Sequence, residues 1–223
     1  MFWGSGVHRV RGIIFDIDGT LADSLGFYYA MACDLVEAVD APPVSREHVY
    51  GLMGSGDPDL LRKLFPPDFP DLELRLQRAA GPRMRDWMRR MAAETQPFAG
   101  SLEMLRALHD AGRPLGIATS ASSALPFLDR WGVRELFTSI VGREHTERRK
   151  PHPDPVLRCM RELGLEPQDT AYIGDSPIDI EAGRSAGVRT VGVLTGTSGR
   201  EVLEAVSPDY ILESVADLTG LLP

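Results

Sequence analysis

Cysteine is scarce in this sequence, and long apolar runs are absent. The two cysteines, Cys33 and Cys159, lie far apart without metal-ligand spacing, so we expect no disulfide framework and a reducing, cytoplasmic compartment. No apolar run approaches the roughly 20 residues that span a bilayer. Residues 1–12 lack the apolar segment of a secretory signal. The sequence therefore predicts neither membrane association nor secretion.

Positive charge is also limited. Lysine and arginine number 24 against 32 aspartate and glutamate residues, which gives a net charge of −8. A chain of this charge has no overall field that would attract nucleic acid or an anionic membrane surface. Lysine occurs only at Lys63 and Lys150, so a lysine within a motif stands out. The five histidines form no pair with metal-ligand spacing, so zinc is not expected.

Six short apolar runs have the length and composition of buried parallel strands. Between residue 100 and the C-terminus they alternate with amphipathic helical segments, such as residues 101–112 and 154–164. This alternation is typical of a doubly wound, Rossmann-like α/β sheet. The six runs comprise residues 10–16, 115–119, 139–142, 171–175, 189–193 and 209–212.

One interval, residues 22–97, interrupts the alternation. It shows no convincing strand and two clear helical stretches, at residues 25–39 and 71–94. A block of this length is too long for an ordinary crossover connection. We interpret it as a small helical cap domain inserted into an α/β core domain of residues 1–21 and 98–223. The apolar core of this cap is expected to include Trp87, Met88 and Met91.

Polar and charged side chains follow four of the predicted strands. Because ligands of open α/β sheets bind outside the carboxyl ends of the strands, we expect these side chains to share one sheet edge. Clustered carboxylates repel one another, and a hard cation such as Mg²⁺, which prefers oxygen ligands, removes the conflict. The side chains are Asp16 and Asp18 after the first strand, Thr119 and Ser120 after the second, Lys150 after the third, and Asp175 and Asp179 after the fourth.

These residue types point to a phosphate site beside a metal ion. Asp16 and Asp175 are the natural direct ligands of Mg²⁺, while Lys150 and the hydroxyl of Thr119 suit a bound dianion. A carboxylate that attacks phosphorus forms an aspartyl-phosphate and divides one difficult displacement into two easier ones. A second carboxylate nearby could protonate the leaving oxygen and later deprotonate water. The alternative is that Asp16 and Asp18 merely cap the helix that begins near Ser24.

Four short motifs carry these residues: DIDGTLADS at 16–24, ATSAS at 118–122, KPHPDP at 150–155 and GDSPIDIEAG at 174–183. In order and spacing they resemble the four motifs of the haloacid dehalogenase-like (HAD) superfamily. The resemblance covers the whole chain and includes a helical cap between the first and second motifs. This arrangement is similar to subfamily I, in the branch of phosphoglycolate phosphatase and β-phosphoglucomutase.

The resemblance implies a Mg²⁺-dependent phosphatase that hydrolyses a small phosphorylated metabolite. True haloacid dehalogenases lack an acid at the position of Asp18, so dehalogenation is disfavoured. The implied roles are Asp16 as nucleophile, Asp18 as general acid/base whose backbone carbonyl also binds Mg²⁺, Thr119, Ser120 and Lys150 as phosphate ligands, Asp175 as metal ligand, and Asp179 as a hydrogen-bonding neighbour of the metal site.

The resemblance also assigns substrate selection to the cap. In related capped phosphatases a loop in the region of GLMGSGDPDLLRKL, residues 51–64, faces the site. Gly54 and Ser55 are therefore candidates for substrate specificity. The alternative is a plain turn between two helices, which would also account for the glycines Gly51, Gly54 and Gly56. Arg62 is a further candidate, because it either steers anionic substrates or lies in solvent.

Two other functions share these residue types. A phosphosugar mutase of the β-phosphoglucomutase type uses the same four motifs, and Thr20 only weakly favours hydrolysis over it. A non-enzymatic phospho-receiver also uses an acid cluster, a threonine and a lysine, but receivers are compact and lack an inserted cap. Neither the substrate nor the oligomeric state, monomer or homodimer, follows from the sequence.

Overall fold

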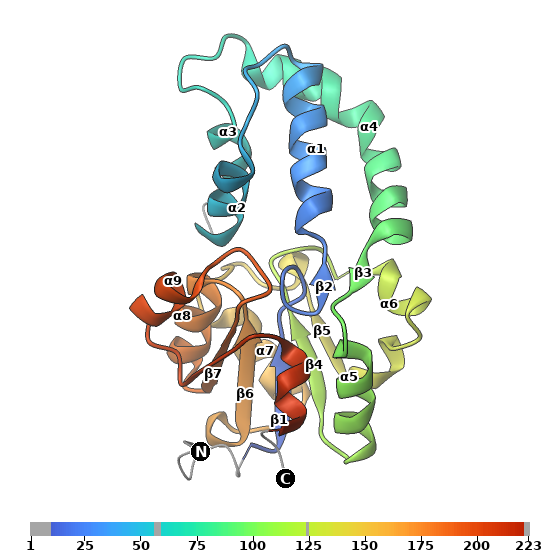
Figure 1. The fold of residues 1–223 in the computed structure, drawn as a ribbon, viewed down its shortest axis with the longest axis vertical. Helices are drawn as coiled ribbons and strands as arrows, with labels where there is room; N and C mark the ends of the chain where they lie inside the picture. The colour runs from blue at the N-terminus through green and yellow to red at the C-terminus, as the bar shows by residue number, and fades with distance from the viewer. Residues whose placement is uncertain (1–9, 56–58, 124, 221–223) are drawn as a thin grey trace.

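Six short apolar strands pair side by side in one parallel sheet (Figure 1). The structure is a computed structural model that describes residues 10–55, 59–123 and 125–220. The strand order β5-β4-β1-β6-β7-β8 confirms the predicted doubly wound α/β fold. The strands are β1 (Gly12–Phe15), β4 (Leu115–Ala118), β5 (Ser139–Val141), β6 (Thr170–Gly174), β7 (Arg189–Val193) and β8 (Tyr210–Leu212).

The central strand β1 aligns the carboxyl ends of its two neighbours. Phe15 is in register with Ile117 of β4 and with Ile173 of β6. The backbone N–H of Asp16 continues the ladder and donates to the carbonyl of Ile173 at 2.8 Å. The residues that follow these three strands therefore emerge together, at the upper edge of the sheet in Figure 1.

Helices cover both faces of the sheet because successive side chains of a strand point to opposite sides. Ile13 and Phe15 of β1 pack with α5 (Ser101–Asp110), α6 (Pro126–Arg130) and the 3₁₀ segment Val215–Gly220. Ile14 packs on the other face with α7 (Asp154–Glu162) and α8 (Pro177–Ala186). The remaining helix of the core is α9 (Arg200–Ala205). The two apolar clusters bury all four residues of β1.

Four helices stand above the carboxyl edge of the sheet (Figure 1). They form a separate apolar cluster that contains Trp87, as predicted, together with Leu35 and Phe65. The prediction for Met88 is wrong: its side chain is 41% exposed, because it lies about 100° around the helix from the inward-facing Trp87. Met91 packs instead against the cluster of the sheet. The helices are α1 (Leu25–Ala38), α2 (Arg46–Ser55), α3 (Leu60–Lys63) and α4 (Leu72–Glu94).

Two connections join these helices to the sheet, and they pair with each other. Strand β2 (Ala22–Asp23) and strand β3 (Gln96–Pro97) form an antiparallel ladder of two residues each. The sequence predicted no strand in this interval, because two-residue strands carry no readable periodicity. Their position at both ends of the helical block supports the division that we propose, a cap of residues 22–97 on a core of the remaining chain. No helix in the described ranges, α4 included, is both long and apolar enough to cross a membrane.

Candidate active site

The loop that follows β1 turns tightly above the sheet. Gly19 has a φ of +79°, a conformation that side chains other than glycine rarely adopt. A Cβ at this position would lie 2.8 Å from Oδ2 of Asp175 and equally close to the Cα of Gly196. Thr195 Oγ1 donates to the carbonyl of Gly19 at 2.7 Å. Glycine at position 19 therefore lets the loop that carries Asp16 and Asp18 lie against the loop of Asp175.

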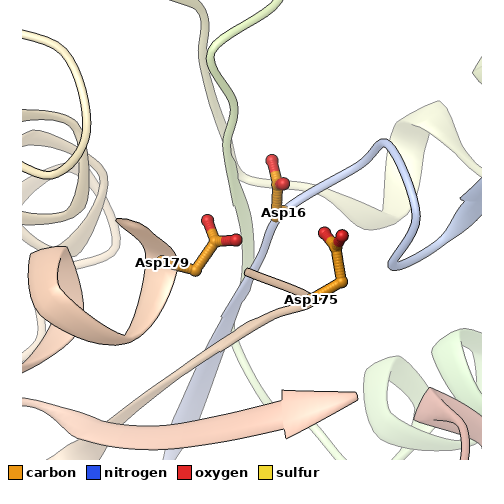
Figure 2. Close-up of side chains that lie close together, drawn as sticks. All are labelled: Asp16, Asp175 and Asp179. Carbon is orange, nitrogen blue, oxygen red and sulfur yellow. The ribbon is translucent and has the colours of Figure 1, made fainter. Parts of the chain in front are cut away.

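Three carboxylates converge at the carboxyl edge of the sheet (Figure 2). Asp16 follows β1, Asp175 follows β6, and Asp179 lies in the first turn of α8. One oxygen of each lies within 4.8 Å of the others, and all three side chains are buried. The structure thus brings together three of the four carboxylates that the sequence placed at this edge.

Lys150 lies among these carboxylates although only 3% of it is exposed. Its Nζ is 2.9 Å from Oδ1 of Asp16 and 2.6 Å from Oδ1 of Asp179. Burial alone would lower the pKa of Lys150, but the attraction of Asp16 and Asp179 outweighs it and raises the pKa above its ordinary value. Three carboxylates and one ammonium leave a net charge of −2 when all are ionised.

Burial raises the pKa of Asp16 and of Asp175, and repulsion by neighbouring carboxylates adds to this effect. Burial raises the pKa of Asp16 well above its ordinary value, and the attraction of Lys150 only partly opposes it. Burial and repulsion by Asp179 raise the pKa of Asp175 to about 6, against hydrogen bonds from Thr197. Oδ1 of Asp16 is buried and, apart from its ion pair with Lys150, accepts no well-directed hydrogen bond from the part of the chain that the structure describes. A divalent cation would neutralise the net charge of −2, so the donor set fits Mg²⁺.

Asp179 differs from Asp175 because each of its two oxygens accepts from two protein donors, whereas the hydrogen bond described for Oδ1 of Asp175 is a single one from Thr20 at 3.3 Å. Oδ1 accepts from Lys150 at 2.6 Å and from the hydroxyl of Tyr172 at 2.9 Å. Oδ2 accepts from the backbone N–H and the hydroxyl of Ser176. These contacts favour the role predicted for Asp179, which is to hold neighbouring groups in place and not to bind the metal directly.

Asp18 lies beside the cluster, half-buried beneath the first helix of the cap. Ser24 Oγ donates to its Oδ1 at 2.5 Å, and the hydroxyl of Tyr28, from α1, donates to its Oδ2 at 3.3 Å. Burial raises the pKa of Asp18, opposed first by the hydrogen bond from Ser24. Burial, followed by the charge of Asp18, raises the pKa of Tyr28 well above its ordinary value. Among the described contacts, neither Asp16 nor Asp18 accepts a backbone N–H of α1, so helix capping does not explain the pair.

Thr119 and Ser120 follow β4, the strand next to β1. Thr119 is buried, and its Oγ1 accepts from the backbone N–H of Ala121 at 3.1 Å. A hydroxyl that accepts in this way still has its own hydrogen to donate, as a phosphate ligand must. Ser120 is exposed. Both residues therefore lie at the predicted edge, and their roles toward phosphate remain predictions.

The sequence analysis missed the loop after β7. Thr197 donates to Oδ2 of Asp175 twice, from its backbone N–H at 2.7 Å and from its hydroxyl at 2.9 Å. A Cβ at Gly196 would lie 2.0 Å from the same oxygen, so only glycine allows this approach. A signal was available, because the Thr-, Gly- and Ser-rich segment 195–199 follows a predicted strand at the functional edge. The contact of Tyr28 with Asp18 had no such signal.

The three candidates for substrate specificity differ in position. Gly54 lies against the core domain, where a Cβ would be 3.0 Å from Oγ1 of Thr197. Ser55 is exposed, and its hydroxyl donates to the carbonyl of Leu52 within α2. Arg62 donates to the carbonyls of Pro66 and Pro67 inside the cap. Gly54 therefore lies beside the loop that follows β7, which also contacts Asp175. Gly56 lies outside the described residues.

Comparison with known proteins identifies the family of this chain. The model of a family described as haloacid dehalogenase-like hydrolase matches residues 13–193. A phosphoglycolate phosphatase of Shigella dysenteriae is 31% identical over 235 residues, which cover 96% of this chain and 92% of that protein. The phosphoglycolate phosphatase of Escherichia coli K12 is 29% identical over 233 residues, with the same coverage of both chains.

Solved structures show the same architecture. A haloacid dehalogenase-like hydrolase of Streptococcus pneumoniae has a TM-score of 0.80 at 20% identity and covers 96% of this chain and 98% of its own. A β-phosphoglucomutase of Clostridium difficile has a TM-score of 0.76, also at 20% identity, over 94% of this chain and 93% of its own. At such identities the likeness establishes the fold alone.

Proposed function

The chain belongs to the family of haloacid dehalogenase-like hydrolases, and we propose that it is a Mg²⁺-dependent phosphatase that acts on a small phosphate monoester. The observation that carries the proposal is Lys150, whose buried ammonium lies between Asp16 and Asp179 beside Asp175. A site that held only a cation would gain nothing from a buried lysine. A site that holds a cation and a phosphate dianion needs one.

Asp16 is the nucleophile of the proposed reaction. One of its carboxylate oxygens attacks phosphorus, the bond from phosphorus to the ester oxygen breaks, and an aspartyl-phosphate forms. Lys150 lies 2.9 Å from the carboxylate, so its charge offsets the repulsion between two anions that must approach each other. Thr119 would donate its hydroxyl hydrogen to a phosphate oxygen, and Ser120 its backbone N–H.

The residues that would hold the metal are Asp16, Asp175 and the backbone carbonyl of Asp18. When bound, Mg²⁺ would neutralise charge on the acids and on the phosphoryl oxygens. Thr197 keeps Asp175 in place with two hydrogen bonds to Oδ2. Thr20 donates to the other oxygen of Asp175 at 3.3 Å and thereby connects the metal ligand to the loop of the nucleophile.

Asp18 is the proposed general acid and base. It protonates the leaving oxygen as the ester bond breaks, and it then removes a proton from the water that hydrolyses the aspartyl-phosphate. Burial raises its pKa, which favours the protonated form that the first step requires. Ser24 and Tyr28 each bind one of its oxygens and so orient the carboxyl group.

Hydrolysis is proposed over phosphosugar mutation because of the relatives. The full-length relatives at 29% and 31% identity are named phosphatases, whereas the mutase shares 20% identity and therefore only the fold. The substrates named for those relatives make phosphoglycolate the first compound to test. A sugar phosphate is the second, because the mutase branch shares the motifs.

A substrate panel with phosphate detection tests the proposal. Purified protein is incubated with about a hundred phosphorylated metabolites, with Mg²⁺ or with EDTA, and inorganic phosphate is measured. We expect metal-dependent release from at least one small monoester. Interconversion of hexose phosphates without net release would establish the mutase instead. Absence of both activities would refute the proposed function.

Replacement of Asp18 by Asn should reduce turnover by about 10²- to 10⁴-fold, the usual contribution of acid–base catalysis. Asn keeps the shape of the side chain but has no proton to give to the leaving oxygen. The loss should be largest for alkyl phosphates, measured as kcat with saturating substrate. The matched control is Asp23→Asn, an exposed acid five residues further along, which should retain normal activity. Equal kcat for both variants would contradict the role of Asp18.

Mg²⁺ binding should weaken as the pH falls through about 6. Below that pH the metal-free protein holds a proton on Asp175, and the cation must displace it. Because this pKa is raised above its unfolded value, the metal-free fold should also lose stability as the pH rises from about 4 to about 6. Calorimetric titration in two buffers of different ionisation enthalpy measures both affinity and proton release. An affinity that is constant between about pH 5 and pH 7.5 would contradict the prediction.

A further inference from the structure

A buried tyrosine lies directly beneath the acid cluster. Tyr172, on β6, is 1% exposed, and its hydroxyl is 2.9 Å from two acceptors. One is the carbonyl of Ala118, at the end of β4, and the other is Oδ1 of Asp179. The Nζ of Lys150 lies 5.8 Å from the centre of its ring. The side chain therefore touches both the strand that precedes Thr119 and the acid that holds Lys150.

We propose that Tyr172 is a positioning residue, which fixes the carboxylate of Asp179 and thereby holds the ammonium of Lys150 against Asp16. The inference rests on the proposed function, because it assumes that Lys150 serves the phosphoryl group. Tyr172 itself makes no contact with the reacting atoms. It acts through Asp179.

The hydrogen-bond inventory around Asp179 supports this role. Each carboxylate oxygen has two lone pairs, and each accepts from two donors: Lys150 and Tyr172 on Oδ1, and two groups of Ser176 on Oδ2. Ser176 fixes one oxygen at the start of α8. The hydroxyl of Tyr172 has one hydrogen and two acceptors at 2.9 Å, the carbonyl of Ala118 and Oδ1 of Asp179. The carboxylate is the stronger acceptor because it is charged, so the hydroxyl fixes the direction of this oxygen from β6. Without it, Lys150 would be the only donor to Oδ1 among the described residues, and the carboxylate could turn about its terminal bond.

The position of Lys150 determines which acceptors its three N–H groups reach. One is donated to Asp179, and the ammonium lies within ion-pair distance of Asp16, which still leaves an N–H for a phosphate oxygen. A carboxylate that turns carries the ammonium with it, away from Asp16 or from the phosphate. We therefore expect loss of the Tyr172 hydroxyl to affect turnover more than the binding of the substrate.

The chain offers an unusually direct readout, because Lys63 and Lys150 are its only lysines. Slow modification with an amine-reactive reagent, followed by mass spectrometry, gives the labelling rate of each lysine in the same sample. Lys63 is exposed on the cap and serves as the internal reference. In the Tyr172→Phe variant we expect the labelling of Lys150 relative to Lys63 to rise about tenfold, as loss of one hydrogen bond to a charged group implies.

Kinetics provide the second measurement. Tyr172→Phe should lower kcat about tenfold and leave KM nearly unchanged. Tyr29→Phe is the matched control, because that hydroxyl lies in the cap, where it is 3.5 Å from the carbonyl of Val44. Its labelling ratio and kcat should equal those of the wild type. Thermal unfolding of each variant shows that the measurements are made on folded protein.

An Asp179→Asn background separates positioning from general loosening of the fold. Asn cannot hold the ammonium as an ion pair, so Tyr172→Phe should have no further effect on the labelling of Lys150 there. Equal effects in both backgrounds, or an unchanged ratio in Tyr172→Phe alone, would overturn the proposal. A wild type that hydrolyses no phosphate ester would refute the proposed function, and with it the role of Tyr172 in turnover, whereas the labelling would still show whether Tyr172 positions Lys150.

Discussion

An Asp16→Asn variant is expected to release phosphate from the best substrate at least about 10⁴-fold more slowly than the wild type. The amide has the shape of the carboxylate but is a very poor nucleophile toward phosphorus. It also removes one charge from the set of ligands that fits Mg²⁺. Single-turnover and steady-state assays with the same substrate measure the loss. No aspartyl-phosphate should be trapped by acid quench from this variant.

The same substitution should make the metal-free protein more stable. Burial raises the pKa of Asp16 well above its ordinary value, so the fold is disfavoured by ionisation of this carboxyl. Replacing it by Asn changes the net charge of the cluster from −2 to −1. We expect a melting temperature a few degrees above that of the wild type in EDTA. This opposition of stability and activity is typical of functional sites.

Asp23→Asn is again the matched control, because Asp23 is an exposed acid of the same segment and of the same charge. Neither its turnover nor its melting temperature in EDTA should change. Full activity of Asp16→Asn would exclude covalent catalysis by this residue. A decrease in its metal-free stability would show that the carboxylate stabilises the fold, contrary to the direction of its pKa.

The edge of the sheet was predictable because it depends on local signals. Asp16, Thr119 and Asp175 each follow a short apolar run, and the carboxyl ends of parallel strands necessarily meet at one edge. That these residues share one edge can therefore be predicted without knowing how the side chains pack. In the structure Phe15 is in register with residues of β4 and β6, so the three strands end at the same level of the sheet.

The contacts around this edge were not predictable, because they depend on how separate elements pack against one another. Tyr28 belongs to the cap and yet binds Asp18, and Thr197 lies 22 residues beyond the Asp175 that it binds. Tyr172 looks like any strand residue until its neighbours are known. Arg62 shows the reverse case, since its charge suggested a substrate ligand and its guanidinium instead binds carbonyls of the cap. Such pairings depend on packing, which the residue pattern does not encode.

Replacement of Lys150 by Met is expected to have the second large effect, and on stability it should act in the opposite direction to Asp16→Asn. Met fills similar volume without the charge, so Asp16, Asp175 and Asp179 would be left with a net charge of −3 in place of −2. Removing one partner of a buried ion pair typically costs about 3–5 kcal/mol. We expect that loss in the free energy of unfolding in EDTA, measured by urea denaturation.

Activity should fall about 10³-fold in Lys150→Met, because a preorganised charge at the reacting group is removed. The control is Lys63→Met, which replaces the second lysine of the chain, a residue of the cap. It should change neither kcat nor the free energy of unfolding by a comparable amount. Lys150→Met with wild-type kcat would contradict the role of Lys150 as a phosphate ligand. A melting temperature equal to that of the wild type in EDTA would contradict the charge balance of the cluster.

The double variant Asp16→Asn, Lys150→Met tests that balance without any reference to activity. Its acids carry the charges of Asp175 and Asp179 alone, which again sum to −2. If excess negative charge destabilises the metal-free fold, the double variant should be more stable than Lys150→Met alone and less stable than Asp16→Asn alone. The size of the effect tests whether the two groups are coupled: Asp16→Asn should stabilise the fold more in the Lys150→Met background than in the wild type, because no attraction to an ammonium 2.9 Å away is then lost with the carboxylate. Strict additivity of the two changes would mean that Lys150 stabilises the site by packing, and that the carboxylates do not need its charge.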